Sequence, residues 1–342
     1  MPRLFIRLQK GIFMSKVRVA ILGCGGMSGE HAKRFAKNPD VEIVGLCDVS
    51  TDVVEKYIER NLSNYSPKPA VFSDAAQMYS ETKPDAVTIV TPHTMHFDHG
   101  MQALEAGCHV LMEKPMVTDS SQAHALKEAV EKAGKIFVVG YNTPCTPAFK
   151  YLRELIRSKE LGKLETVTGW QTQNWKNLTV GSWRQNPELS GGGQMYDSGA
   201  HMFNSLVWTV EQPIKDVLAF TDNLGTPVDI NGTANIRFQD GTLATMTIAG
   251  NCPADGSGMY YTFENGRVEI DGWGGSYIKL WRGNKSEEVK LEGESQSPND
   301  NFIDAILGRA EAQTSPTNGV IQSQLMDAIY ESAQSGRTAQ PK

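Results

Sequence analysis

Residues 17–29 read Val-Arg-Val-Ala-Ile-Leu-Gly-Cys-Gly-Gly-Met-Ser-Gly, and this stretch decides the fold of the first part of the chain. Residues 17–22 are an apolar, β-rich run, which is typical of a buried parallel strand. The glycines after it fit the template G-x-G-x-x-G, except that Ser28 stands at the third position, with Gly29 next to it. Such a turn leaves backbone N–H groups free at a helix N-terminus, where a pyrophosphate can bind. We therefore expect the following residues to hold a dinucleotide: Gly23, Gly25, Gly26 and Met27.

A second apolar run, residues 41–47, ends at Asp48. An acid at this place accepts hydrogen bonds from the hydroxyls of an adenine ribose. Between Val49 and Glu55 the sequence has no Lys or Arg that would bind a 2′-phosphate, and Asp48 would repel one. The pattern therefore predicts NAD rather than NADP. The alternative is a glycine-rich turn without a ligand, in which Asp48 caps the next helix.

Strand-like and helix-like segments alternate up to about residue 140. Apolar runs at residues 86–90, 109–112 and 136–139 are separated by segments of helical composition at 30–37, 51–60, 96–106 and 119–133, the last with Asp119 or Ser120 as N-cap. Strands that alternate with helices form βαβ units with a parallel sheet. We predict a doubly wound α/β domain over residues 16–140.

The pattern changes after about residue 150. A helix is expected at residues 148–158 and a strand around 165–173. Runs with a period of two then follow at 232–238, 242–249, 259–263, 267–270 and 276–281, with turn signals such as Asp240-Gly241 between them. Helices at 301–307 and 320–335 close the chain. Residues 141–338 are thus expected to form a second α/β domain with a large open, mostly antiparallel sheet.

Composition narrows the class of protein. The formal net charge is −6, which favours neither nucleic acid nor an anionic membrane as partner, and no apolar run approaches the roughly 20 residues of a membrane span. The five cysteines are far apart, without a CxxC pair, which argues against disulfides and zinc. Cys24, Cys47 and Cys108 lie in or beside apolar runs, which is typical of reduced core residues in a cytoplasmic protein. Residues 1–15 are expected to be a disordered or mis-annotated extension: either Met14 is the true start, or residues 1–13 are disordered.

The triplet Glu113-Lys114-Pro115 follows a predicted strand, at the sheet edge where ligands bind. Hydride transfer from a carbinol carbon needs a group that takes the hydroxyl proton. Lys114 can do this if burial and a cationic cofactor lower its pKa. The alternative is a surface Glu-Lys pair in a loop.

The run of residues 191–201, Gly-Gly-Gly-Gln-Met-Tyr-Asp-Ser-Gly-Ala-His, supplies an acid and an imidazole. A helix is expected at residues 197–208, so Asp197 and His201 would share one face. His201 suits proton transfer near neutral pH, and Asp197 could orient it or hold a substrate hydroxyl. Gly191–Gly193 would let the backbone pass close to a ligand. Alternatively, Asp197 is a helix N-cap and His201 a satisfied amphipathic residue.

Other residues are candidates by position. Thr91, Pro92, His93 and His96 follow a predicted strand at the edge that would touch a cofactor. The spacing of His93, His96 and His99 raises the question of a metal, but no cysteine pair or carboxylate set accompanies them, so no metal is predicted. Aromatic faces pack against sugar rings, and a guanidinium binds hydroxyls or phosphate. Trp175, Trp183 and Arg184 are therefore candidates for substrate binding. The alternative is that they pack in an ordinary core.

Taken together, residues 16–338 resemble the Gfo/Idh/MocA family of oxidoreductases, which includes glucose-fructose oxidoreductase and inositol dehydrogenase. The resemblance implies an N-terminal Rossmann domain and a C-terminal domain whose open sheet packs in homodimers or homotetramers. It implies that Lys114, Asp197 and His201 are catalytic, with Lys114 or His201 as proton acceptor. It also implies a set of residues that line the cofactor: Thr91, Pro92, Glu113, Lys114 and Asn142.

Three positions depart from the family pattern: His93 replaces an asparagine, Asn204 an acid, and the segment after Asn142 lacks an arginine. The leading hypothesis is an NAD-dependent dehydrogenase that acts on a sugar, sugar acid or cyclitol. Two alternatives remain open. One is a redox-neutral glycosidase that uses NAD, and the other is a binding protein that responds to NAD without catalysis.

Overall fold

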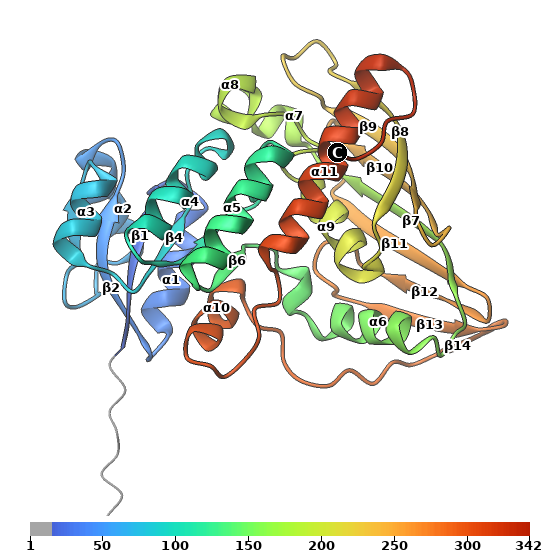
Figure 1. The fold of residues 1–342 in the computed structure, drawn as a ribbon, viewed down its shortest axis with the longest axis horizontal. Coiled ribbons are helices and arrows are strands. Elements are labelled where there is room, and N and C mark those ends of the chain that lie inside the picture. The colour runs from blue at the N-terminus through green and yellow to red at the C-terminus, as the bar shows by residue number, and fades with distance from the viewer. Residues whose placement is uncertain (1–15) are drawn as a thin grey trace, which may run out of the picture.

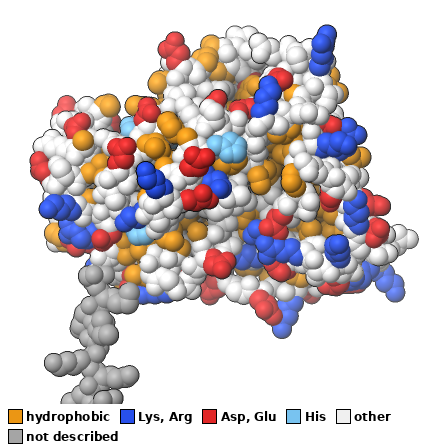
Figure 2. Space-filling model, in the orientation of Figure 1, with side chains coloured by type: hydrophobic (Ala, Val, Ile, Leu, Met, Phe, Trp, Pro, Cys, Tyr) orange, Lys and Arg blue, Asp and Glu red, His pale blue; other side chains and the backbone are white. Residues whose placement is uncertain are grey.

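The computed structural model describes residues 16–342, so the predicted extension, with Met14, lies outside the described residues. Two sheets dominate the fold, with helices packed between them (Figure 1). Acidic and basic side chains are interspersed on the face shown in Figure 2, which agrees with the small net charge of the chain. Among residues 16–342, none of the helices is long and apolar enough to span a membrane.

The first sheet, sheet A, has six strands in the order β3-β2-β1-β4-β5-β6, and every pairing in it is parallel. This order confirms the predicted doubly wound domain, and it places a crevice at the carboxyl ends of β1 and β4, where the order reverses. The strands are β1 Val17–Leu22, β2 Val41–Cys47, β3 Ala70–Phe72, β4 Ala86–Ile89, β5 His109–Met112 and β6 Phe137–Val139.

Five helices connect the strands of sheet A: α1 Ser28–Lys37, α2 Thr51–Asn61, α3 Ala75–Thr82, α4 His96–Glu105 and α5 Ser120–Ala133. Asp119 caps α5, because its carboxylate accepts the N–H groups of Ser121 and Gln122. The sequence analysis missed β3 and α3. The strand β3 has three residues, of which only Phe72 is buried, so its apolar signal is weak.

The second sheet, sheet B, has eight strands in the order β14-β13-β12-β11-β7-β10-β9-β8. All its pairings are antiparallel except that of β7 with β10, which is parallel. The predicted mostly antiparallel sheet is confirmed. Its strands are β7 Leu164–Thr172, β8 Ile214–Asp222, β9 Asn231–Phe238, β10 Leu243–Ala249, β11 Gly256–Phe263, β12 Gly266–Ile270, β13 Ile278–Arg282 and β14 Lys285–Glu287.

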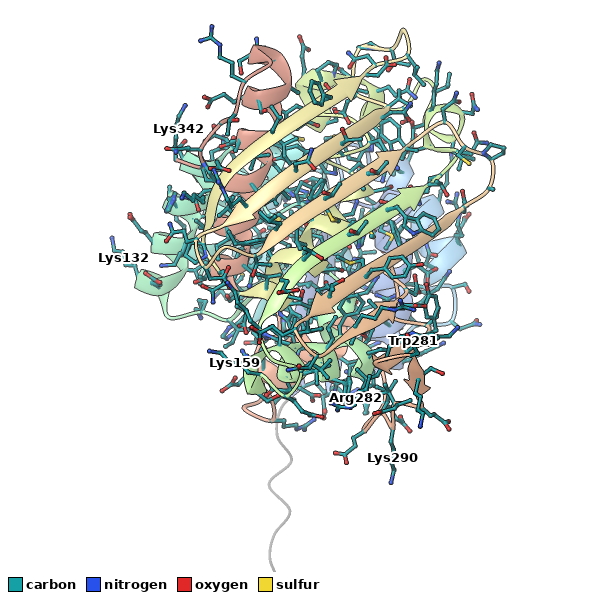
Figure 3. All side chains as sticks on the ribbon, turned by 90° about the vertical axis from the view of Figure 1, so that its right-hand side faces the viewer. Lys132, Lys159, Trp281, Arg282, Lys290 and Lys342 are labelled. Atoms are coloured by element: carbon teal, nitrogen blue, oxygen red, sulfur yellow. The ribbon has the colours of Figure 1, made fainter. Side chains whose placement is uncertain are left out.

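One face of sheet B is covered by helices and the other is open. The helices α6 Pro147–Ser158, α9 Gly199–Val210 and α11 Pro316–Ser335 lie between the two sheets (Figure 1). Side chains at alternate strand positions, such as Ile236 and Met246, pack against Phe203 and Leu206 of α9. The opposite face carries no helix in Figure 3. The short helices α7 Trp175–Leu178 and α8 Pro187–Ser190 precede α9.

The end of the chain returns to the first sheet. Helix α10, Pro298–Ile306, places Phe302 and Ile303 in the same buried cluster as Val19 and Phe35. The predicted core cysteines Cys24, Cys47 and Cys108 are buried and free. The N-terminal core therefore contains side chains from both ends of the described chain.

Candidate active site

Two adjoining cavities of about 490 and 510 Å³ lie at the carboxyl edge of sheet A. Gly25, Val90, Thr91 and Trp183 line both of them, so they form one elongated cleft. The first, cavity 1, is bordered by both sheets' connecting loops and contains the predicted proton-handling residues. The second, cavity 2, lies over the ends of β1 and β2. Every predicted cofactor residue except His96 lines one or both: Gly23, Gly25, Gly26, Met27, Asp48, Thr91, Pro92, His93, Glu113, Lys114 and Asn142.

The glycine turn at the start of α1 has a steric cause. Gly23 has a φ of +94°, and a Cβ atom there would lie 2.6 Å from the carbonyl oxygen of Val90. Ser28, at the third template position, is buried and its hydroxyl donates to Tyr57 Oη at 2.8 Å. No side chain caps α1, although the N–H groups of Gly29 and Glu30 donate to the carbonyls of Gly26 and Met27 at 3.3 and 3.1 Å. The positive end of the helix therefore faces the glycine turn without a side chain over it.

Asp48 faces cavity 2 from the end of β2. Its Oδ2 accepts the backbone N–H of Cys24 at 2.7 Å, which ties the acid to the glycine turn. Asp74, the N-cap of α3, lines the same cavity and accepts the N–H of Gln77 at 2.7 Å. Two carboxylates therefore stand at this end of the cleft.

Asp197 joins three elements in cavity 1. Lys114 Nζ donates to its Oδ1 at 2.7 Å and to its backbone carbonyl at 3.1 Å. Trp175 Nε1 donates to Oδ2 at 2.7 Å, and Arg184 Nε donates to the same oxygen at 3.1 Å. Burial alone would raise the pKa of this carboxyl, but Lys114, His93 and Arg184 hold it well below its usual range.

The structure corrects the predicted start of the helix. Helix α9 begins at Gly199, so Asp197 lies in the preceding turn and does not share a helix face with His201. The cause is Asp229, whose carboxylate accepts the N–H groups of Gly193 and Met195, both at 2.8 Å, and holds the segment in turns. The two residues still reach the same cavity, but no hydrogen bond joins them in the described structure.

The expected role of the glycine run is also wrong. A Cβ at Gly193 would lie 1.9 Å from the carbonyl oxygen of Asp229, and one at Gly191 would meet Thr118. A Cβ at Gly192 would meet the hydroxyl of Tyr330. These glycines therefore allow close packing against protein backbone and side chains, and they do not line either cavity.

His201 lines cavity 1 between two aromatic rings. The centroid of its ring lies 4.2 Å from that of Trp273 and 5.6 Å from that of Tyr141. Its Nδ1 is buried and has no hydrogen-bond partner within residues 16–342. Burial, together with the positive charge of Lys114, lowers the pKa of His201 to about 3. The imidazole is therefore neutral at pH 7.

His93, which departs from the family pattern, lies beside Asp197. Its Nε2 is 3.7 Å from Asp197 Oδ1, and its Nδ1 lies 3.0 Å from the carbonyl oxygen of Ser190. The ring meets that of Trp183 edge-on, with 4.7 Å between the centroids. Burial lowers the pKa of His93 to about 3.

His96 does not line the cleft, contrary to expectation. Both of its nitrogens face backbone carbonyls, Nδ1 that of Pro115 at 2.7 Å and Nε2 that of Thr91 at 2.9 Å. It therefore braces the two loops that carry Thr91 and Lys114. His99 Nδ1 lies 2.9 Å from Thr91 Oγ1, so the three histidines do not converge. Residues 16–342 contain no cluster of His, Cys, Asp or Glu that could hold a metal ion.

The residues of cavity 1 that the sequence analysis did not single out include Gln173, Asp255 and Trp273. Trp273 lies in the turn between β12 and β13, where the Asp271 carboxylate accepts the N–H groups of Trp273, Gly274 and Ser276. The available signal was a tryptophan flanked by glycines in a segment without strand periodicity. The predicted substrate residues Trp175, Trp183 and Arg184 all line this cavity.

A doubly wound sheet with a glycine turn, and a cavity with an amine, a carboxylate and a neutral imidazole, define the class of nucleotide-dependent oxidoreductases. Residues 17–141 match the family described as "Oxidoreductase family, NAD-binding Rossmann fold", and residues 149–278 match the "GFO/IDH/MocA C-terminal domain". The chain belongs to the GFO/IDH/MocA oxidoreductase family, as the resemblance indicated.

Relatives and solved structures agree with this assignment. D-glucoside 3-dehydrogenase of Escherichia coli K12 is 30% identical over 64% of this chain and 62% of its own length. Oxidoreductase P35 of Formosa agariphila is 26% identical over 56% of this chain and 59% of its own length. The matches thus span about three fifths of these relatives. Among solved structures, GenD2 from gentamicin A biosynthesis, in complex with NAD, superposes with a TM-score of 0.82 at 24% sequence identity. The match covers 96% of this chain and 97% of the GenD2 chain, which shows a shared fold.

Proposed function

We propose that this protein is an NAD-dependent dehydrogenase that transfers a hydride between the nicotinamide and a carbinol carbon of a sugar-like substrate. The observation that carries the proposal is the meeting of Lys114, Asp197 and His201 in a cavity that is continuous with the glycine turn. These residues come from different parts of the chain, and their side chains are buried or nearly so. Perturbed titratable groups in such a cleft are typical of acid–base catalysis.

The residues at the glycine turn fit NAD. The uncapped N-terminus of α1 suits a pyrophosphate, and Asp48 has one carboxylate oxygen bonded to Cys24 and the other available for ribose hydroxyls. Asp48 and Asp74 would both repel a 2′-phosphate, which favours NAD over NADP. NAD, when bound, supplies the hydride acceptor.

The chain's own residues then handle the proton. Asp197 accepts a hydrogen bond from Lys114 and so orients the amine. The sequence analysis expected Asp197 to orient His201 instead. Lys114 and His201 face the same cavity, and one of them takes the proton of the substrate hydroxyl while the other donates to or accepts from its oxygen. Residues 16–140 bind the cofactor in this proposal, and residues 141–338 complete the substrate side.

The cavity suits a carbohydrate. Trp175, Trp183 and Trp273 line it together, and the exposed part of Arg184 lies over the ring of Trp183 at 4.5 Å. Aromatic faces with a few convergent polar groups are the usual walls of a small-molecule site. The activity of the Escherichia coli relative on a glucoside supports this class of substrate.

The experiment follows the absorbance of NADH at 340 nm with NAD and a panel of glycosides, sugars, sugar acids and inositols. We expect NADH formation, with a lower kcat/KM for NADP than for NAD. Lys114→Ala should lower kcat by about 10²–10⁴-fold, the usual contribution of a positioned acid–base group, while NAD still binds.

Lys176→Ala is the matched control, because Lys176 lies on α7 near the cavity but donates to the carbonyl of Leu224. Wild-type turnover in the Lys114 variant would contradict the proposal. Release of p-nitrophenol from aryl glycosides without net NADH would instead identify the redox-neutral glycosidase, and tight NAD binding with no activity would identify the binding protein.

We also propose that the open face of sheet B contacts a second copy of the chain. Phe220 is 59% exposed, Leu243 50% and Tyr260 44%, and all three belong to strands of this sheet (Figure 3). A broad flat face with exposed aromatic side chains is typical of an isologous interface.

A further inference from the structure

Glu113 lines cavity 1 beside Lys114, and its carboxylate is tied to a residue of the first helix. Its Oε1 lies 2.9 Å from His31 Nε2, and its Oε2 accepts the backbone N–H of Lys114 at 3.1 Å. His31 belongs to α1, the helix that starts at the glycine turn. Both side chains are almost fully buried, with 7% of Glu113 and 1% of His31 exposed.

The hydrogen bonds behind His31 run in one direction. Arg34 Nη1, which is only a donor, lies 3.4 Å from Asn299 Oδ1. The other amide atom of Asn299, Nδ2, then faces His31 Nδ1 at 3.1 Å as a donor. Nδ1 is therefore the acceptor, and the proton of the imidazole is on Nε2, which donates to Glu113. The order of donation is Arg34, Asn299, His31, Glu113.

We propose that His31 is a positioning residue that keeps Glu113 ionised, as a hydrogen-bond acceptor in the cofactor cleft. Asn299 of α10 fixes the tautomer of His31. This inference rests on the proposed function, because it needs NAD in the cleft. It makes the helix α10 part of the cofactor site, although Asn299 is 268 residues from His31 in sequence. A fixed carboxylate favours the cationic ring of NAD⁺ over the neutral ring of NADH.

The surroundings of Glu113 keep it ionised. The titratable groups that face it are the following: His31 from α1, His96 from α4, Lys114 from its own loop, His201 from α9 and Tyr141 after β6. Burial alone would raise the pKa of Glu113, but the hydrogen bond from His31 and the charge of Lys114 help to lower it to about 2. Removal of the His31 donor therefore removes one of the main interactions that keep the Glu113 carboxylate ionised.

The test measures the dissociation constants of NAD⁺ by titration calorimetry and of NADH by its fluorescence, at pH 6 and pH 8. His31→Phe keeps a planar ring but has no donor, whereas His31→Gln places an amide N–H near the position of Nε2. We expect His31→Phe to weaken NAD⁺ binding about tenfold, more at pH 6 than at pH 8, and NADH binding less than threefold. His31→Gln should restore most of the NAD⁺ affinity.

Each other outcome has a definite meaning. Equal loss of NAD⁺ and NADH affinity in both variants would overturn the inference, because a merely structural role of His31 does not distinguish the two ligands. Unchanged affinities would overturn it as well. If His31→Phe fails to fold, Asn299→Leu, which leaves His31 and Glu113 in place, must show the same selective loss of NAD⁺ affinity. Wild-type protein that binds neither nucleotide would contradict the proposed function itself.

Discussion

At the scale of single residues, one carboxylate organises the candidate site. Asp197 is 4% exposed and accepts hydrogen bonds from Lys114, Trp175 and Arg184. Burying a carboxylate costs free energy of folding unless the charge is paired, and the same holds for a buried cation. The ion pair therefore holds the loop after β5, the helix α7 and the turn before α9 in one arrangement.

The buried histidines predict how stability depends on pH. His93 and His201 both have a native pKa of about 3, below the ordinary value of 6.5. Between these values the unfolded chain binds more protons than the native one, so the free energy of unfolding falls as the pH is lowered from about 6.5 toward 3. Each histidine contributes about 1.4 kcal/mol per pH unit within this window. Urea unfolding at pH 7, 6 and 5 measures the slope.

His93→Asn is the matched variant for this measurement, because asparagine is the residue that the family pattern places here and it does not titrate. The slope between pH 6 and pH 5 should be shallower in this variant by roughly one histidine's contribution. An identical slope would mean that His93 is not held neutral in the folded protein.

At the scale of elements, the turn between β12 and β13 determines where Trp273 lies. The Asp271 carboxylate accepts from Ser257 Oγ at 2.7 Å and Ser276 Oγ at 2.9 Å, in addition to the backbone N–H groups of the turn. These bonds hold Trp273 against His201. Because this turn is already fixed by its own hydrogen bonds, it loses little conformational entropy when a substrate packs against Trp273.

We expect Asp271→Ala to loosen this turn and raise the KM for the carbohydrate severalfold, while the dissociation constant of NAD stays near its wild-type value. Steady-state kinetics at saturating NAD measure the KM. Asp240→Ala is the control, because Asp240 holds the β9–β10 turn through Thr242 in the same way but does not line the cleft. Equal changes in both variants would indicate general destabilisation.

At the scale of the whole molecule, sheet B is covered on one face by α6, α9 and α11 and is open on the other (Figures 1 and 3). We expect the wild-type chain to elute with a mass at least twice the 37.6 kDa of one chain in light-scattering chromatography. Phe220→Asp combined with Leu243→Asp should yield the monomer, since charges would enter an apolar contact. Leu291→Asp, exposed outside the strands, is the control. A monomeric wild-type protein would contradict the proposed contact.

The sequence predicted most elements of the fold to within a few residues. Strands β1, β2 and β5 have the predicted bounds, because their apolar runs are mostly buried and flanked by turn signals. The strands β3, β8 and β14 and the helices α3, α7 and α8 were missed. In β14 all three residues are exposed, so pairing with β13 determines it rather than any periodicity of its own.

The candidate site divides in the same way. Local pattern determined the glycine turn, Asp48 at the end of β2 and Lys114 after β5, since the carboxyl ends of parallel strands meet at one edge. The grouping of Lys114 with Asp197 and His201 came from the resemblance to the family. Only the tertiary structure decided the partners. Lys114 reaches Asp197 across 83 residues, His96 turns to two backbone carbonyls, and Asn299 reaches His31 from the far end of the chain. Periodicity and local propensity act over a few residues, whereas hydrogen bonds and burial depend on distances in space that only the folded chain establishes.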